Sequence, residues 1–441
     1  MTLQESREIQ KELQIAVTGL SGSRRRNGNT KFLLQRALGA GAKYVDEINE
    51  QLALRGTRIN LTLVPKIFET HFDDHDEIVQ SVGPSNAILL ASPVYFGSIS
   101  PTLNELLREV SNDPSIDLQG KAAGSIAVGT QRNGGQETAI EDFWRWYLDR
   151  NITFLGNGPV TSQYGGTAWG GGRLTARRDV YGISTTMGAG KRLIQDALVR
   201  STGMKVVNAV LKEAGSPALG TDSFDEGSEL KVEPSTTLPS CRFLIFSDVA
   251  TPSRDVIETM NGIERAAEEF AETAHLKTNN SKIDFLSLEE DMKSVKDCAA
   301  CAICPPGNQK IPGVYACIYD DDLNRNFHRF YESSAIICST QEKFGLVPPK
   351  YWRTLNRMRS VRRNDYMLTG RMGSVIGGSS PASQIPLKWL VRNNLSILAS
   401  SRENHFEFGK LLFRETLLRQ SGMKFFEERG VNIWTRPTHH E

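Results

Sequence analysis

The sequence predicts an α/β protein made of two tandem doubly wound parallel sheets. In the first half of the chain, short apolar runs that suit buried strands alternate with helix-like patterns. This alternation is typical of a parallel sheet covered by helices on both faces. The alternation restarts after an irregular segment, and 441 residues are enough for two domains of about 200 residues each. The second half is therefore interpreted as a diverged copy of the first.

The predicted elements follow the same order in both halves. Strands are expected in the first half over residues 13–19, 86–94, 122–130 and 151–160. Helices are expected there over residues 30–55, 101–110 and 136–149. In the second half, strands are expected over residues 242–247, 282–288, 334–340 and 373–379, with helices over residues 254–275 and 322–332.

The segment between the two halves, residues 213–240, interrupts this pattern. It is rich in Gly, Ser, Pro and acidic residues and has no hydrophobic periodicity, so we interpret it as a linker. The predicted organisation is a cofactor-binding domain over residues 1–212, a linker over 213–240 and a second domain over 241–441.

Composition restricts the class of function. The chain has 52 basic and 51 acidic residues, a net charge of +1, which does not suggest a nucleic-acid partner. The polar start MTLQESREIQKELQ lacks the apolar core of a signal peptide, and no apolar run approaches the ~20 residues of a membrane span. We expect a soluble cytoplasmic protein without membrane contact. In that compartment clustered cysteines indicate metal or redox chemistry rather than disulfides.

Three loops that follow predicted strands of the first half carry the candidate cofactor residues. In open α/β sheets, ligands bind outside the carboxyl ends of the strands. GLSGSRRRNGNT (19–30) precedes a helix and suits an anion, although it could also be a capped helix with a basic surface loop. ASPVYFGSIS (91–100) offers backbone amides and a flat apolar wall to a planar heterocycle, or it could be a β-to-α turn that plugs the core. GTQRNGGQE (129–137) has glycines that allow close approach to a ligand.

The candidate cofactor-binding residues lie in these three loops. They are Ser21, Ser23, Arg25, Asn27, Asn29, Thr30, Pro93, Val94, Tyr95, Phe96, Gly97, Thr130, Arg132, Asn133, Gly134, Gly135 and Gln136. The side chain of Gln136 could instead cap the following helix. No side chain stands out as a general acid or base, so no catalytic residue is predicted.

The stretches GSRRRNGNT, SPVYFGSISPTLNELLREV and TQRNGGQETAI together resemble the NADPH-dependent FMN reductase superfamily of flavodoxin-like proteins. Within it they look most like the iron–sulfur flavoprotein branch, over roughly residues 12–200. The resemblance implies two tandem flavodoxin-like domains, the second diverged. It also implies an FMN phosphate at Ser23, Arg25, Asn29 and Thr30, with the isoalloxazine ring against residues 93–97 and 130–136. The loop at residues 164–170 is expected to shape the flavin pocket, across a subunit contact in one arrangement.

Four of the six cysteines lie within twenty residues of each other, in DCAACAICPP and in the following VYACIYDDD. Cys298, Cys301 and Cys304 are evenly spaced and Cys317 follows, which favours a [4Fe–4S] cluster with four thiolate ligands. Structural zinc is the alternative, but zinc sites usually use two separated cysteine pairs. Cys241 and Cys338 fall in strand patterns and are assigned no role.

In the iron–sulfur flavoproteins that this sequence resembles, the cysteine motif precedes the SPVYFG strand of the same domain. Here the first domain has no cysteine, and the cluster motif stands at the equivalent position of the second domain. That domain lacks the flavin loops, since SDVATPSRDV stands in place of the phosphate loop. We therefore expect FMN in the first domain and the cluster in the second.

Three functional hypotheses remain at this point. The first is an iron–sulfur flavoenzyme that moves electrons between NAD(P)H or a redox protein, FMN and the cluster. The second is an FMN enzyme that reduces a quinone, nitro or nitrogen–oxygen compound, with the second domain as a substrate cover. The third is a redox sensor that controls partner binding. The resemblance also implies a homo-oligomer, with a dimer expected.

Overall fold

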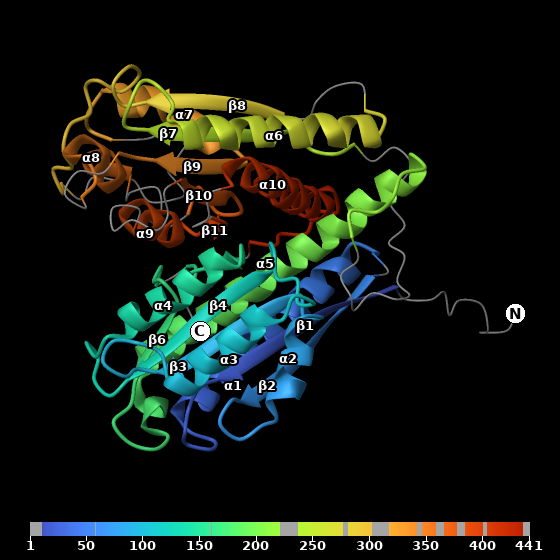
Figure 1. The fold of residues 1–441 in the computed structure, drawn as a ribbon, viewed down its shortest axis with the longest axis vertical. Helices are drawn as coiled ribbons and strands as arrows, with labels where there is room; N and C mark the ends of the chain where they lie inside the picture. Colours follow the sequence, from blue (N-terminus) through green and yellow to red (C-terminus); the bar gives the residue numbers. More distant parts are fainter. Residues whose placement is uncertain are drawn as a thin grey trace, which may run out of the picture.

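The computed structural model describes residues 11–57, 59–159, 161–220, 237–276, 281–301, 317–341, 346–358, 366–376, 384–399 and 404–434. The first half of the chain forms the lower part of the molecule in Figure 1 and the second half the upper part. Two long helices, α5 (Val180–Glu213) and α10 (His405–Glu428), pack against each other where the halves meet.

The first half contains a parallel sheet with the strand order β2-β1-β3-β4-β5. Its strands are β1 (Lys11–Ser21), β2 (Ile59–Glu69), β3 (Ala87–Pro93), β4 (Ala122–Gly129) and β5 (Thr153–Phe154). This is the 2-1-3-4-5 order of flavodoxin-like folds. A further short strand, β6 (Gly166–Trp169), pairs with the end of β4.

The second half repeats this order with its own strands, as β8-β7-β9-β10-β11. These strands are β7 (Cys241–Ser247), β8 (Ser281–Ser287), β9 (Ala335–Ser339), β10 (Met372–Ile376) and β11 (Ser396–Ile397). The predicted fold class, two tandem flavodoxin-like units, is confirmed. The exact domain boundaries 1–212, 213–240 and 241–441 stay a prediction.

The two sheets join edge to edge into one sheet. β11 pairs antiparallel with β5 through Ile397 and Phe154, so the two copies meet through equivalent strands. Each of these strands has only two residues, and the seam contributes very little backbone pairing. The sequence patterns predicted two sheets and gave no sign of this seam.

Helices cover both faces of the joined sheet, and each face has one apolar core that continues through both halves. One core includes α1 (Asn29–Leu54), α5, α6 (Arg254–Thr273) and α10. The helices of the other core are α2 (His75–Val82), α3 (Pro101–Asn112), α4 (Gln136–Asp149), α7 (Asp322–Glu332), α8 (Pro349–Arg357) and α9 (Gln384–Arg392). A short 3-10 helix, η1 (Thr175–Arg178), precedes α5.

The helices α5 and α10 are also a sequence repeat. Residues 190–207 read GKRLIQDALVRSTGMKVV and residues 409–426 read GKLLFRETLLRQSGMKFF. At the crossing, a Cβ on Gly203 would lie 1.7 Å from the carbonyl oxygen of Leu418. A Cβ on Gly422 would lie 1.9 Å from the carbonyl oxygen of Val199. The two glycines therefore make the same close backbone contact in opposite directions.

The same pair of helices exchanges buried ion pairs. Arg200 of α5 pairs with Glu415 of α10 at 2.7 Å, and Arg419 of α10 pairs with Asp196 of α5 at 2.7 Å. Each helix thus supplies an acid and, four residues later, an arginine to its counterpart. Burial opposes the ionised form of Glu415, but the charges of Arg200, Arg414 and Arg419 dominate and hold its pKa well below the usual range. The contact has the reciprocity of a two-fold dimer interface within one chain.

Replacing Gly203 by alanine tests the helix crossing. We expect Gly203→Ala to lower the free energy of unfolding by on the order of 3 kcal/mol, because the new methyl group overlaps a backbone carbonyl that cannot move aside. Gly39→Ala is the matched control, since Gly39 lies in α1 with open space around its Cβ. The control should gain about 0.5–1 kcal/mol from helix propensity. Equal midpoints of denaturant unfolding for the two variants would contradict the crossing.

The buried ion pairs predict a pH-dependent cost for Glu415→Gln. At pH 7 we expect a loss of about 3–5 kcal/mol of unfolding free energy, because three arginines lose their carboxylate. The folded-state pKa of Glu415 is depressed, so its contribution is present above the unfolded pKa of about 4.3 and is lost as the pH falls further. The difference between variant and parent should therefore shrink below about pH 4. Exposed Glu264→Gln serves as the control and should change stability by less than about 0.5 kcal/mol at every pH.

Candidate cofactor sites

The loop between β1 and α1 has the features of an anion site. The N–H group of Gly22 donates to the carbonyl oxygen of Ala91 at 2.8 Å, which fixes the loop against β3. Helix α1 begins at Asn29 without a side-chain cap and has no acidic residue in its first turn. The hydroxyl oxygen of Ser21 is buried and has no hydrogen-bond partner among the described residues. An uncapped helix start beside an unpartnered hydroxyl group suits a phosphate.

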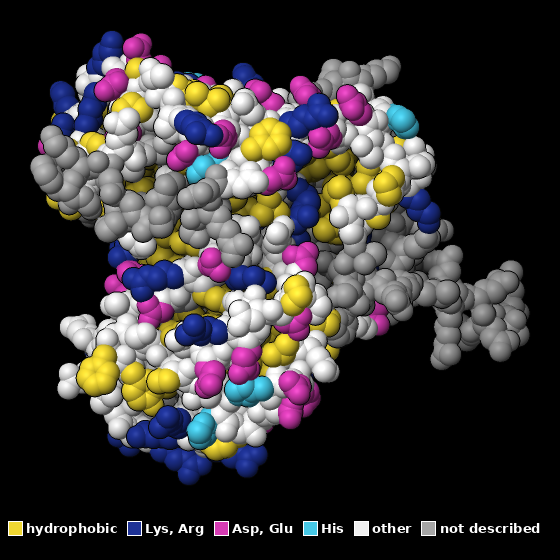
Figure 2. Space-filling view, viewed as in Figure 1, with side chains coloured by type: hydrophobic (Ala, Val, Ile, Leu, Met, Phe, Trp, Pro, Cys, Tyr) yellow, Lys and Arg dark blue, Asp and Glu magenta, His cyan; other side chains and the backbone are white. Residues whose placement is uncertain are grey.

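The arginines of this loop point to solvent, while its small polar residues are buried. Ser23 and Thr30 are buried, and Arg24, Arg25 and Arg26 are exposed. Figure 2 shows Lys and Arg side chains gathered along the lower edge of the first half. Arg25 is exposed in this loop, and its contact with a phosphate stays a prediction.

Glu69 is a residue of this site that the sequence reasoning missed. It is buried at the end of β2, and its carboxylate accepts the N–H of Asn27 at 2.9 Å and pairs with Lys31 at 2.8 Å. The backbone of Asn27 is thus held by Glu69, and its positive φ of 51° sets the turn into α1. Asn27 acts on the loop conformation through this contact.

Asn29 connects the anion loop to the segment after β6. Its Nδ2 donates to the carbonyl oxygen of Gly172 at 2.8 Å, and its Oδ1 accepts the N–H of Ala176 at 3.2 Å. A Cβ on Gly170 would lie 2.7 Å from the same Nδ2 atom. The loop that follows β6 therefore crosses directly over the anion loop.

The loop after β3 forms a rigid turn with an exposed aromatic tip. Tyr95 and Ser98 exchange two backbone hydrogen bonds of 2.9 Å, and Phe96 and Gly97 have φ values of 53° and 80°. The hydroxyl group of Ser98 donates to Asp142 of α4 at 2.5 Å. The side chain of Phe96 is fully exposed. A positive φ is also unusual for a residue with a bulky side chain. The turn is suited to meet a flat ligand or a partner.

The loop after β4 packs against this turn, backbone to backbone. Gly135 has a φ of 87°, and a Cβ there would lie 2.9 Å from the Cα of Gly97. Only glycine satisfies both the conformation and the close approach. Together with the hydrogen bond from the N–H of Val94 to the carbonyl oxygen of Val128, at 2.9 Å, this contact makes one wall from two loops.

Gln136 is buried within this loop, and its amide bonds to the loop itself. Its Nε2 donates to the carbonyl oxygens of Gln131 and Ala168, and its Oε1 accepts the N–H of Gly134. Its role in the structure is to shape the loop. Thr130, Arg132 and Asn133 lie in the same loop and are exposed.

The predicted residues of the three loops thus lie along the carboxyl edge of β1, β3 and β4. An unpartnered hydroxyl group, an uncapped helix start and a glycine-lined wall fit a ligand that combines a phosphate with a planar ring.

The two ends of segment 164–170 lie in different environments. Tyr164 packs edge-on against Trp144 at 5.5 Å and lies beneath Arg392 of the second half, whereas Gly170 lies beside the anion loop.

The equivalent loop of the second half does not have these features. Helix α6 is capped by the side chain of Ser253, which accepts the N–H of Val256, and Asp255 lies in its first turn. Asp248, at the end of β7, accepts the N–H of Gln341 at 3.0 Å, and burial raises the pKa of its carboxyl group. An anion at this helix start would lose a capped N–H group and face carboxylates. This edge therefore does not suit a flavin phosphate.

The cysteine segment lies between β8 and α7, the position that the loop between β2 and α2 occupies in the first half. Its two ends are pinned together. The N–H of Ser294 donates to Asp322 at 2.7 Å, and the N–H of Lys296 donates to Asp321 at 3.0 Å. The chain therefore departs before Cys298 and returns after Cys317 at one place in the fold, which we call the base of the cysteine segment.

A buried ion pair supports this base from α8. Asp321 pairs with Arg357, both side chains are 1% exposed, and Arg357 also lies over the ring of Tyr319 at 5.2 Å. Arg353, one turn earlier, pairs with Asp297 at 2.7 Å. α8 thus holds the residues that flank the cysteines on both sides.

The cysteines themselves are only partly within the described residues. Cys298 is half-buried, Cys301 is exposed and Cys317 is half-buried, while Cys304 lies outside the described residues. Among the described residues, no group of three or more metal-ligating side chains is gathered. Thiols are the donor type that suits iron–sulfur or zinc, and Cys298, Cys301 and Cys317 follow or precede the hydrogen-bonded base of this segment. Cys241 and Cys338 are buried in strands, where burial raises the pKa of each thiol to about 12.

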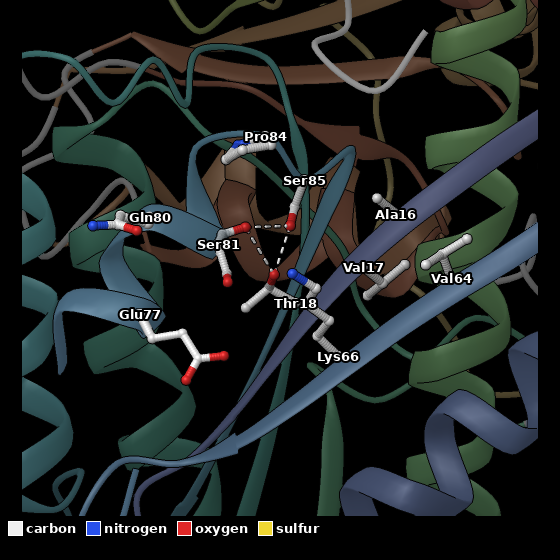
Figure 3. A pocket seen from close by; sticks show the side chains of 10 residues that line it. All are labelled: Ala16, Val17, Thr18, Val64, Lys66, Glu77, Gln80, Ser81, Pro84 and Ser85. Atoms are coloured by element: carbon white, nitrogen blue, oxygen red, sulfur yellow. Dashed lines mark hydrogen bonds between the residues drawn. The ribbon is translucent and has the colours of Figure 1, made fainter. Parts of the chain in front are cut away.

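A pocket of about 260 Å³ lies between β1, β2 and α2, away from the cofactor loops (Figure 3). Three of its polar groups contact one another: the hydroxyl oxygens of Thr18 and Ser85 are 2.6 Å apart, and each lies within hydrogen-bond distance of the carbonyl oxygen of Ser81. We assign it no ligand.

Among the described helices, none is long and apolar enough to cross a membrane.

Comparison with known proteins identifies the family of the first half of the chain. The profile of the NADPH-dependent FMN reductase family matches residues 15–143. An iron–sulfur flavoprotein of Methanocaldococcus jannaschii is 34% identical over 185 residues, which are 41% of this chain and 95% of that protein. The chain belongs to the iron–sulfur flavoprotein family. An iron–sulfur flavoprotein of Methanosarcina thermophila is 28% identical over 185 residues, which are 40% of this chain and 92% of that protein.

Family membership confirms the predicted superfamily, its branch and the class of FMN-dependent oxidoreductases. The matched length in each relative corresponds to less than half of this chain. Among solved structures, the Trp repressor binding protein from Bacillus subtilis is 18% identical with a TM-score of 0.29 and covers 39% of this chain and 98% of its own.

The contact between the loops at Gly97 and Gly135 predicts the effect of substituting Gly135. We expect Gly135→Ala to weaken FMN binding at least tenfold, because the left-handed backbone and the contact with Gly97 both exclude a Cβ. Gly171→Ala is the matched control in a neighbouring loop, since its Cβ would lie 3.8 Å from Thr130, an ordinary contact. Quenching of FMN fluorescence by apoprotein measures both affinities. Equal affinities would show that the two loops do not form the flavin wall.

Proposed function

We propose that this iron–sulfur flavoprotein is a two-cofactor oxidoreductase with FMN in its first half and a [4Fe–4S] cluster in its second half. Electrons would move between NAD(P)H or a redox protein, the flavin and the cluster. The flavin supplies the exchange between two-electron and one-electron steps. The observation that carries the proposal is the difference between the two halves. The first half has an uncapped helix start after β1, and the second half has a cysteine segment after β8 whose ends are joined by hydrogen bonds.

The chain's own residues would bind and orient the flavin in the first half. Ser21, Ser23 and Thr30 would receive the phosphate at the start of α1, with Arg25 supplying charge. The two touching loops at Gly97 and Gly135 would hold the ring and exclude water from one of its sides. Burial of the ring against fixed backbone groups is the means by which a protein adjusts flavin reactivity.

The four thiolates of Cys298, Cys301, Cys304 and Cys317 would hold the cluster in the second half. The even spacing of the first three cysteines favours iron–sulfur over zinc. The pinned base between Lys296 and Asp321 would bring the first and last ligands together without the metal. The hydrogen bonds at this base would keep the two ends of the segment close, and binding of the metal would then gather the four thiolates.

The two proposed sites are far apart within one chain. Six strand-to-strand steps separate β4, at the flavin wall, from β8, which precedes the cysteines. At about 4.8 Å per step, this is about 29 Å along the sheet. In Figure 1, β8 and α7 lie at the top of the view while β3 and α3 lie in the lower part. We therefore propose that electron transfer runs between two copies of the chain.

Exposed apolar side chains support such an assembly. At the proposed flavin edge, Phe96 is fully exposed. Tyr95 is exposed in the same turn, Trp169 at the end of β6 and Tyr181 in the first turn of α5. Beside the cysteine segment, Ile318 and Trp352 are also exposed. Apolar patches of this kind mark interaction sites. The second half meets the first through α5, α10 and the β5–β11 seam, which favours the relay over a role as a substrate cover.

The first experiment measures the cofactors of protein purified without oxygen. We expect about one FMN, four iron and four acid-labile sulfide per chain, as a [4Fe–4S] cluster requires. Cys298→Ser and Cys317→Ser should each abolish most of the bound iron and sulfide and keep the FMN. Cys338→Ala is the matched control, because Cys338 is a buried strand residue outside the segment. One zinc per chain without sulfide would overturn the cluster and leave a single-cofactor FMN reductase.

The route of electrons is tested by coexpressing two defective variants with different affinity tags. Gly135→Ala stays without flavin at FMN concentrations that fill the parent site but not its weakened site, and Cys298→Ser lacks the cluster, so neither alone should show flavin-dependent reduction of a cluster under these conditions. A mixed dimer holds one intact flavin and one intact cluster on different chains, and we expect cluster reduction, followed by EPR, to return in it. Reduction that stays absent in a mixed dimer with both cofactors bound would place the relay within one chain.

A further inference from the structure

Asp179 is a buried carboxylate at the flavin edge that the three loops do not contain. It lies between η1 and the start of α5, and its side chain is 2% exposed. Part of its role is ordinary helix capping, because its Oδ1 accepts the N–H of Gly182 at 3.0 Å. The remaining contacts come from two other segments and are not part of a cap.

These contacts bring two loops to one carboxyl group. Oδ2 accepts the N–H of Trp169, the last residue of β6, at 2.9 Å. The guanidinium group of Arg132, in the loop between β4 and α4, forms an ion pair with Oδ1. The next residue, Gly170, donates to the carbonyl oxygen of Gly129 at 2.9 Å and contacts Asn29. Asp179 is thus connected to all the segments around the proposed flavin site except the turn at Tyr95.

Arg132 is held from two directions although it is half exposed. Besides the ion pair with Asp179, its guanidinium group lies 5.2 Å from the ring centroid of Tyr181. The hydroxyl group of Tyr181 accepts the Nε2–H of Gln163 at 3.0 Å. An arginine that pairs with a buried carboxylate and also stacks on an aromatic ring has lost most of its conformational freedom before any ligand binds. It presents a fixed cation at the rim of the site.

We propose that Asp179 is a positioning residue that holds Arg132 as a fixed positive charge beside the flavin ring. The inference rests on the proposed FMN site. Reduced flavin carries a negative charge at neutral pH, and a cation beside the ring favours that form over the oxidised form. Asp179 acts through Arg132 and through the N–H of Trp169, not by contact with the flavin.

A capping role alone makes different predictions. In that case loss of the carboxylate would lower the melting temperature and leave flavin affinity and potential unchanged. In the positioning role, the effect of Asp179 on flavin binding depends on whether Arg132 is present. A double-mutant cycle separates the two, because it measures the coupling between the residues directly.

The experiment uses the full chain with FMN as the probe. Apoprotein of the parent, Asp179→Asn, Arg132→Gln and the double variant is titrated with FMN, and melting temperatures are recorded in parallel. We expect Asp179→Asn to weaken FMN binding at least tenfold in the parent and less than threefold when Arg132 is already glutamine. We expect Arg132→Gln to shift the flavin midpoint potential to more negative values. Glu264→Gln, which removes an exposed acid from α6 in the second half, is the control and should change neither quantity.

Two outcomes would overturn the inference. One is an unchanged FMN affinity in Asp179→Asn with only a lower melting temperature, which is the result of a cap. The other is an equal loss in both backgrounds, which would show that Asp179 does not act through Arg132. Failure of the parent protein itself to bind FMN would instead refute the proposed function, so the two failures are distinguishable.

Discussion

The close crossing of α5 and α10 is the contact on which the rest of the molecule depends. The β5–β11 seam pairs strands of only two residues, so it contributes little to joining the halves. The helices join them instead, through the backbone contacts of Gly203 and Gly422 and the exchanged ion pairs. Both features are reciprocal, as in the interface of a two-fold symmetric dimer. In this chain the interface is a buried core that the two halves share.

The proposed division of cofactors between the halves has a local physical basis in each half. An anion needs free N–H groups at a helix start, which α1 offers and α6 does not, because Ser253 caps it and Asp255 follows. In the first half the connection from β2 to α2 is short and its acid, Glu69, holds the anion loop. In the second half the same connection is long, and its acids hold the base of the cysteine segment.

The sequence predicted the buried strands β1, β3 and β4 and the position of the three loops that follow them, because buried strands and glycine-rich turns leave local patterns. It missed β2, which is only partly buried, and predicted a strand at 151–160 where β5 has two residues. It did not predict Glu69, Asp142 or Asp179, each of which holds a cofactor loop from an element distant in sequence. Their carboxylates look like ordinary surface or capping acids until the fold brings them to the loops. The seam between β5 and β11 was also beyond prediction, since two residues have no periodicity. The α5–α10 repeat was not predicted either, although the similar stretches GKRLIQDALVRSTGMK and GKLLFRETLLRQSGMK are the signal that marks it.

The geometry of the fusion also constrains the proposed electron route. Joining two copies through β5 and β11 places the β1–β3–β4 edge of one half and the β8 edge of the other at distant parts of a single sheet. The helix crossing and the shared sheet hold these two edges apart, so the proposed sites do not meet within one chain in this fold. A second copy can, because it approaches from outside and is limited only by its surface. The exposed aromatic turn at Phe96 and the exposed Ile318 beside Cys317 are the surfaces through which such an approach would be made.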